Sequence, residues 1–187
     1  YREPFKAKVE GIEYEVPCIV MDKAVCDLSE LVSLATMYRL FAPSELDDND
    51  RARLDRLPPK LQHIVRNWHD DVTVKSMVWQ MLDGIHHLHK HCITHLDIKL
   101  ENVFVTADGT CLIADFGLAK WHGKKVSPNT QRPNVKSTNY SGTASYLPPE
   151  AFRAQFEEGF EYNLFGRDIW ALGVTACSIL HRQDEAL

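Results

Sequence analysis

The chain has 187 residues, enough for one sizeable core or for one lobe of a larger domain. It is 44% hydrophobic and 25% charged with a formal net charge of −5, so it has the composition of a soluble globular protein, and nothing favours nucleic acid or an anionic membrane surface as a partner. The longest apolar run, residues 169–180, is too short to cross a bilayer, so we expect no membrane segment in this chain.

Cysteine usage and the first residues bear on where the protein is found. Five cysteines are scattered without a C-x-x-C pair, which favours an intracellular reducing compartment over a disulfide framework. No charged segment followed by an apolar one opens the chain, so we expect no signal peptide here. Residue 1 is Tyr rather than an initiator Met, and we therefore expect the natural N-terminus to lie upstream.

The first third of the chain predicts strands, a helix and a polar segment. Apolar residues on either side of a Glu-Gly pair predict strands within residues 1–21. A helix is predicted over 28–40, where apolar residues share one face, and either Asp27 or Ser29 can cap its start. Residues 43–60 are polar and charged and contain a Pro-Pro pair, so we interpret them as a surface insertion.

An acidic run within this insertion invites comparison with a calcium-binding loop. The run begins at Asp47, and an EF-hand counted from there needs Gly at the sixth position and Glu at the twelfth. The chain has Ala52 and Pro58 instead. A solvated surface loop is therefore the favoured interpretation.

The middle of the chain predicts a long helix and a hairpin. Apolar residues recur at three- and four-residue steps over 72–90, which indicates an amphipathic helix capped by Asp70 or Asp71. Two short apolar runs follow at 103–105 and 111–113, and the Asp-Gly pair between them is typical of a hairpin turn.

The last part of the chain predicts a loop followed by a helix. Residues 120–141 are polar and lack periodicity, so we expect a long mobile loop. Residues 168–180 are mostly apolar and predict a helix that is buried on nearly all sides.

Two motifs on either side of the hairpin predicted over residues 103–113 indicate the function. Residues 95–102 read His-Leu-Asp-Ile-Lys-Leu-Glu-Asn and residues 115–117 read Asp-Phe-Gly. They resemble the protein kinase catalytic loop, H-R-D-x-K-x-x-N, and its D-F-G motif. Residues 142–150 resemble the segment that ends in A-P-E, with Pro148 in the Ala position, and residues 168–173 resemble the D-x-W-x-x-G start of a long buried helix.

The resemblance covers nearly the whole chain and implies an α+β, protein kinase-like fold. Residues 1–24 would be the end of the N-lobe and the hinge, and residues 25–187 the helical C-lobe, with an insertion near 43–60. The glycine-rich loop, the strand lysine and the helix glutamate of the family would lie upstream. The last helices, with the arginine that pairs the A-P-E glutamate (here Glu150), would lie downstream.

The resemblance also implies roles for the motif residues. Asp97 would orient the attacking hydroxyl and accept its proton, and Lys99 would neutralise charge on the transferred phosphoryl group. The hydroxyl of Thr143 could bridge these two side chains, and Lys99 and Thr143 both go with Ser/Thr specificity in the family. Asn102 and Asp115 would bind ATP through Mg²⁺, because both supply oxygen ligands.

At the start of the chain, residues 21–24 resemble the hinge that binds adenine. Met21 would be the gatekeeper, and the backbone of Asp22 and Ala24 would contact the purine edge. Asp27 could reach the ribose hydroxyls, or it could cap the following helix.

Other residues of the motifs are expected to be structural. The resemblance implies that His95 and Phe116 pack in a hydrophobic stack and that Asp168 accepts hydrogen bonds from backbone N–H groups of the catalytic loop. Several histidines lie between 86 and 95, but they lack the Glu of a metalloprotease helix, so we expect a solvated helix end rather than a zinc site.

The main departure from the family is Leu96, which replaces the catalytic-loop arginine. That arginine normally holds a phosphorylated residue of the activation loop, and leucine cannot. We therefore expect activity to be independent of a phosphate docked at residue 96. Ser127, Ser137, Thr138 and Ser141 remain candidate phosphorylation sites in the loop.

The implied function is an ATP-dependent protein kinase that transfers the γ-phosphoryl group of Mg-ATP to Ser or Thr hydroxyls of a protein substrate. This fragment alone is expected to be inactive. One alternative is a pseudokinase or scaffolding module, favoured by Leu96, Pro148 and the insertion at 43–60. Another is a naturally truncated product that is inert or competes with a full-length relative. An upstream G-x-G-x-x-G turn and V-A-x-K lysine would favour the enzyme.

Overall fold

A computed structural model describes most of the chain. The described residues are 5–9, 12–16, 23–41, 44–68, 71–123, 135–138 and 141–181. Met21, Asp22, Asp70 and Ser127, which carry some of the predictions above, lie outside these residues.

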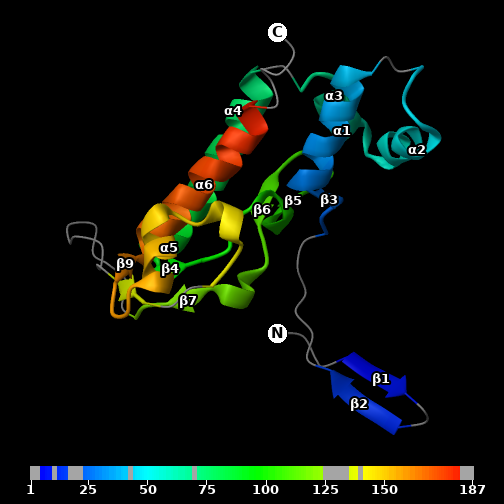
Figure 1. Ribbon diagram of the computed structural model, residues 1–187. Helices are drawn as coiled ribbons and strands as arrows, with labels where there is room; N and C mark the ends of the chain where they lie inside the picture. The colour runs from blue at the N-terminus through cyan, green and yellow to red at the C-terminus, as the bar shows by residue number, and fades with distance from the viewer. Residues whose placement is uncertain are drawn as a thin grey trace.

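The strands form small antiparallel sheets (Figure 1). Near the N-terminus, β1 (Phe5–Val9) pairs with β2 (Ile12–Val16), which confirms strands in this region. A second sheet has the order β3-β5-β6 and joins β3 (Cys26–Asp27) to β5 (Val103–Val105) and β6 (Cys111–Ile113). The predicted β5–β6 hairpin is therefore confirmed.

Helix α1 (Leu28–Leu40) begins and ends where the sequence predicts. Asp27 caps it, since its Oδ1 accepts a hydrogen bond from the Glu30 N–H at 2.8 Å. The helix buries one apolar face, formed by Leu28, Leu31, Val32, Leu34 and Ala35.

The polar segment after α1 is folded, and the prediction of a solvated loop there is wrong. It contains α2 (Asp48–Arg56), and α3 (Pro59–Arg66) begins at its end. Asp47 caps α2 by accepting a hydrogen bond from the Asp50 N–H at 2.7 Å, so the acidic run is a helix start. The large apolar residues of these helices and of the turn between them are buried in the main core: Leu54, Leu57, Leu61, Ile64 and Val65.

Helix α4 (Asp71–Lys90) confirms the predicted amphipathic helix. It lies beside α6 (Leu164–His181), and the two helices run through the centre of the C-terminal part (Figure 1). Met77, Met81 and Ile85 of α4 are fully buried and join the main core with α1, α3 and the β3-β5-β6 sheet. Among the described residues, none of the helices is both long enough and apolar enough to span a bilayer.

The predicted long loop contains two short strands. β4 (Ile93–Thr94) pairs with β7 (Lys120–Trp121), and β8 (Lys136–Ser137) pairs with β9 (Tyr162–Asn163). Residues 124–134 lie outside the described part. Helix α5 (Pro149–Phe156) covers a second, smaller apolar cluster formed by Leu96, Leu147, Ala151, Tyr162 and Leu164.

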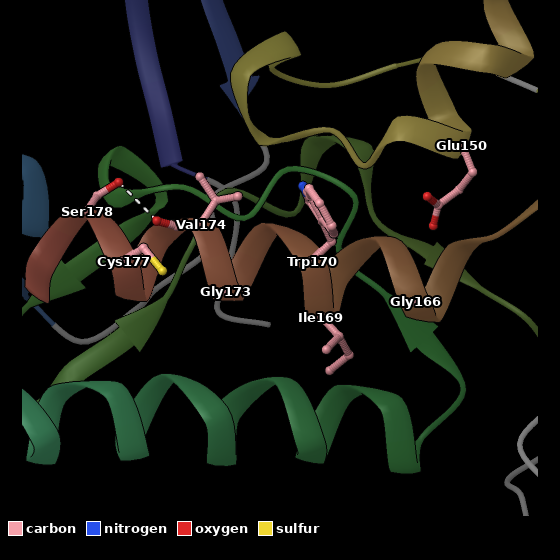
Figure 2. A pocket seen from close by; sticks show the side chains of 8 residues that line it. All are labelled: Glu150, Gly166, Ile169, Trp170, Gly173, Val174, Cys177 and Ser178. Carbon is pink, nitrogen blue, oxygen red and sulfur yellow. Dashed lines mark hydrogen bonds between the residues drawn. The ribbon is translucent and has the colours of Figure 1, made fainter. Parts of the chain in front are cut away.

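Helix α6 differs from its prediction in two ways. It begins at Leu164 rather than at Asp168, and one of its faces is exposed. Ile169 and Trp170 are 43% and 46% exposed, and with Glu150 of α5 they line a groove of about 760 Å³ (Figure 2). The prediction of a helix buried on nearly all sides is wrong, because an apolar sequence does not determine which neighbours cover it.

Candidate active site

A buried carboxylate on α6 fixes the segment that carries the motif residues. Asp168 is fully buried, and its two oxygens accept the backbone N–H groups of His95 and Leu96, each at 2.8 Å. The Nε2 of His89 lies 2.9 Å from Asp168 Oδ2 and donates to it. The prediction that Asp168 is a structural acceptor is confirmed.

His95 connects this segment to the strand before Asp115. Its Nδ1 accepts the Asp97 N–H at 3.3 Å, and its Nε2 lies 2.9 Å from the carbonyl oxygen of Ala114. Because that carbonyl can only accept, the proton of the ring lies on Nε2. The His95 ring also meets the Phe116 ring edge to face at 5.0 Å, which confirms their packing together.

The carboxylate of Asp97 is surrounded by hydrogen-bond donors. Its Oδ1 accepts from the backbone N–H and the hydroxyl of Thr143, at 3.1 and 2.8 Å. Its Oδ2 accepts from Lys99 Nζ at 3.1 Å and from Asn102 Nδ2 at 3.0 Å. Donors on both oxygens stabilise the ionised form and fix the orientation of the carboxylate.

These contacts shift the acidity of Asp97. Burial by itself would raise its pKa, but the hydrogen bonds from Thr143 and Lys99, together with the charge of Lys99, hold the pKa below its ordinary value of 3.8. The side chain is therefore a carboxylate at neutral pH, able to orient a hydroxyl group and receive its proton.

Thr143 and Lys99 complete a closed set of contacts around Asp97. Lys99 Nζ donates to Thr143 Oγ1 at 3.0 Å, and that hydroxyl donates in turn to Asp97 Oδ1. Thr143 lies 46 residues from Asp97 in the sequence, so these bonds join the segment 95–102 to the segment before α5. The bridging geometry that the sequence suggests is present.

The orientation of Asn102 follows from its two acceptors. Its amide nitrogen donates to the backbone oxygen of Asp97 at 2.8 Å and to the Asp97 carboxylate at 3.0 Å. Both N–H groups are thus used, so Oδ1 is the atom through which Asn102 could ligate a cation. The Asn102 carbonyl also accepts the Ala114 N–H at 2.9 Å, which joins the two motifs.

Asp115 lies in an exposed turn after β6. Its backbone is left-handed, with φ 57° and ψ 75°, and its Oδ1 accepts the Gly117 N–H at 3.2 Å. A Cβ on Gly117 would lie 3.1 Å from this oxygen, so a side chain at residue 117 would require the Asp115 carboxylate to shift. A carboxylate and an amide oxygen are the kinds of ligand that suit a hard cation such as Mg²⁺.

The predicted adenine-binding residues are only partly described. Met21 and Asp22 lie outside the described residues, and Ala24 is half-buried just before β3. Asp27 caps α1, so one of its two predicted roles is observed. Contacts of Asp27 and Ala24 with a nucleotide stay a prediction.

Sequence reasoning missed two buried residues behind the site. The prediction of a solvated helix end is wrong for His89, which is 2% exposed and bonds Asp168. Arg167 carried no prediction, yet it is also 2% exposed and donates to the backbone carbonyl of Leu96 at 2.6 Å. The available signal was a charged residue directly before Asp168 in an otherwise apolar stretch.

Comparison with known proteins supports what the geometry indicates. The family pattern described as protein kinase domain matches residues 52–185. The 3-phosphoinositide-dependent protein kinase 1 of Arabidopsis thaliana is 36% identical over 105 residues, which are 54% of this chain and 20% of that protein. The serine/threonine-protein kinase cds1 of Schizosaccharomyces pombe is 36% identical over 108 residues, which are 56% of this chain and 21% of that protein.

A probable cyclin-dependent kinase 8 of Dictyostelium discoideum is 35% identical over 107 residues, covering 55% of this chain and 25% of that protein. The chain thus spans a quarter or less of the length of these three relatives. The matched part contains both motifs and the helices that position them. The chain therefore belongs to the protein kinase domain family.

Proposed function

We propose that the full-length protein is an ATP-dependent serine/threonine protein kinase. The observation that carries this proposal is the set of donors around Asp97, which come from Lys99, Asn102 and Thr143. Phosphoryl transfer depends mainly on positioning and on charge stabilisation, and this set supplies both.

In the proposed reaction, a Ser or Thr hydroxyl of a protein substrate approaches Asp97. The hydroxyl oxygen bonds to the γ-phosphorus of ATP, the bond to the β–γ bridging oxygen breaks, and the hydroxyl proton passes to the Asp97 carboxylate. Lys99, 3.1 Å from that carboxylate, is placed to offset negative charge on the phosphoryl oxygens.

We propose Mg²⁺ as the accompanying cation, held by Asn102 Oδ1 and the Asp115 carboxylate. The fit rests on the hydrogen bonding of Asn102, whose amide N–H groups are both used, and on the exposure of the Asp115 carboxylate. When bound, the ion would neutralise charge on the phosphates of ATP.

A pseudokinase is the competing candidate because Leu96 replaces an arginine of the motif. Leu96 is 3% exposed and packs in the apolar cluster that includes Leu147 and Ala151. This placement favours the enzyme, because the substitution removes neither a metal ligand nor the proton acceptor.

The decisive experiment compares wild-type and Asp97→Asn forms of the full-length protein. Transfer of labelled phosphate from ATP to degenerate peptides with a fixed Ser, Thr or Tyr would be measured. We expect transfer to Ser and Thr peptides, a loss of about 10²–10⁴-fold in kcat for Asp97→Asn, and a nearly unchanged KM for ATP.

The matched control is Asp55→Asn, which neutralises an exposed aspartate on α2 and should keep wild-type kcat. Equal activity of the Asp97→Asn and wild-type proteins would overturn the assignment of Asp97. Absence of transfer by the wild-type protein, with ATP binding retained, would favour the pseudokinase.

A further inference from the structure

A buried arginine lies directly behind the catalytic loop. Arg167, near the start of α6, is 2% exposed. Its Nη2 donates to the backbone carbonyls of Leu96, at 2.6 Å, and of Ser141, and its Nη1 donates to the Tyr162 hydroxyl at 3.0 Å. All three acceptors are neutral.

Burying a guanidinium without a carboxylate partner is costly. In the part of the chain that the structure describes, none of the ion pairs involves Arg167. Dipoles of carbonyl and hydroxyl groups therefore have to compensate for the lost hydration. A buried guanidinium of this kind has to be held firmly by its hydrogen bonds, so the segments that Arg167 bonds indicate its role.

Arg167 connects two segments that are far apart in the sequence. Leu96 belongs to the catalytic loop, and Ser141 lies two residues before Thr143. Thr143 in turn supplies both bonds to Asp97 Oδ1. One guanidinium nitrogen thus joins the backbone beside Asp97 to the backbone that delivers Thr143.

The residue between Ser141 and Thr143 shows how closely these parts approach. Gly142 has a φ of 91°, and a Cβ there would lie 2.5 Å from Arg167 Nη2 and 2.7 Å from the Leu96 carbonyl oxygen. The same point is 3.5 Å from Asp97 Oδ1. The backbone at residue 142 therefore has no room for a side chain between the guanidinium and the catalytic carboxylate.

Arg167 and its neighbour Asp168 together hold the peptide groups of Leu96. Asp168 Oδ1 accepts the Leu96 N–H, and Arg167 donates to the Leu96 carbonyl. Leu96 has a φ of 69°, a conformation that costs a non-glycine residue free energy unless its surroundings enforce it. Two adjacent residues of α6 enforce it here.

We infer that Arg167 is a positioning residue that ties the segment carrying Thr143 to the catalytic loop, with no phosphate required. The inference rests on the proposed function for its kinetic consequences. Leu96 cannot donate to the segment at Ser141, whereas Arg167 does so from inside the protein. The link is permanent because it depends on an arginine and a backbone carbonyl, neither of which is modified by phosphorylation.

Variants of the full-length protein can test this link. Arg167→Met removes all three hydrogen bonds while keeping a long side chain. Arg167→Lys keeps the charge but loses the planar fork that reaches several acceptors at once. Arg153→Met is the matched control, because Arg153 is an exposed arginine on α5 that forms an ion pair with Glu157.

Two measurements are made on each variant: peptide phosphorylation kinetics and amide hydrogen exchange at residues 141–143. We expect Arg167→Met to lower kcat by about 10–100-fold with little change in KM for ATP, and to accelerate exchange at Thr143, whose N–H bonds Asp97. Arg167→Lys should lie between Arg167→Met and wild type in both measurements, and Arg153→Met should match wild type. Phosphatase treatment of the wild-type protein should leave kcat unchanged.

Arg167→Lys decides the matter if Arg167→Met fails to fold. Wild-type kcat and exchange in Arg167→Lys would overturn the inference, and so would a failure of Arg167→Lys to fold, since Arg167 would then be required for the fold as a whole. A large loss of wild-type kcat after phosphatase treatment would also overturn it. Hydrogen exchange needs no turnover, so an inactive wild-type protein would overturn the proposed function while the link to Ser141 is still tested.

Discussion

The two acidic residues of the site, Asp97 and Asp115, are held in opposite ways. Asp97 accepts hydrogen bonds from side chains of Lys99, Asn102 and Thr143, on both of its oxygens. Asp115 is exposed, and its carboxylate accepts the Gly117 N–H within its own turn.

The difference indicates that the protein itself orients the Asp97 carboxylate, whereas the Asp115 carboxylate is available to bind a ligand. The orientation of Asp97 is set by contacts within the protein, so the proposed proton acceptor is preorganised before a substrate arrives. The exposed Asp115 carboxylate instead offers lone pairs to a cation. We therefore expect changes around Asp97 to affect turnover and changes at Asp115 to affect nucleotide binding.

Among the variants that test this difference between Asp97 and Asp115, we expect Asp115→Asn to have the largest effect. Asn tolerates the left-handed backbone and keeps an oxygen for the Gly117 N–H, so the turn should persist. Loss of the negative charge should weaken Mg-ATP binding and reduce kcat/KM for ATP by about a thousandfold or more.

This prediction is checked by titrating ATP at several Mg²⁺ concentrations and by measuring thermal unfolding. The melting temperature should stay close to that of the wild type because the residue is exposed. An unchanged dependence on Mg²⁺ would show that Asp115 does not ligate the ion. A large loss of stability would show that its role is structural.

A smaller but still large effect is expected for Lys99→Met, which acts on the Asp97 side of the comparison. The variant removes the charge 3.1 Å from Asp97 Oδ2 and the bond to Thr143. We expect kcat to fall by about 10²–10³-fold and KM for ATP to stay within a few-fold of wild type. Lys60→Met, at an exposed position of α3, is the control. A large rise in KM for ATP with unchanged kcat would contradict the assignment.

The parts of this site that sequence predicts well depend on local pattern. The β5–β6 hairpin follows from short apolar runs around an Asp-Gly turn, and Gly109 in that turn has a φ of 82°. The hairpin returns the chain, so the segment before Asp115 lies beside Asn102, as the bond from the Ala114 N–H to the Asn102 carbonyl shows.

Long-range burial accounts for what the sequence does not predict. Helices α2 and α3 hide their few leucines, such as Leu54 and Leu61, against α1, and a polar sequence with isolated leucines carries little sign of that packing. Arg167 is similar, because its partners Leu96 and Ser141 are 71 and 26 residues away. The opposite holds for α6, whose sequence is mostly apolar although one of its faces is exposed. The sequence does not indicate which elements cover an apolar helix face.

The smallest predicted effect is that of Thr143→Val, which tests how the Thr143 hydroxyl affects the pKa of Asp97. Thr143→Val removes the hydroxyl that donates to Asp97 Oδ1 but keeps the backbone N–H that donates to the same oxygen. We expect kcat to fall by about tenfold, and the pKa of Asp97 to rise toward its ordinary value of 3.8 because one bond that lowers it is lost. Thr143→Ser, which keeps a hydroxyl, should restore both properties.

The sign of the effect on stability follows from the direction of that pKa shift. Because the pKa of Asp97 is lower in the folded protein than in the unfolded chain, its ionised form stabilises the fold above the ordinary value of 3.8, and this contribution is lost as the pH falls through the folded-state pKa. Thr143→Val should therefore show a smaller acid-induced loss of stability from this group, and Asp97→Asn should show none. Melting temperatures measured as a function of pH in wild type, Thr143→Ser, Thr143→Val and Asp97→Asn would rank the acid-induced loss of stability of the four proteins. If Thr143→Val matched wild type while Asp97→Asn differed, the Thr143 hydroxyl would not be what holds Asp97 in its ionised form, and Lys99, Asn102 and the Thr143 N–H would have to hold it instead.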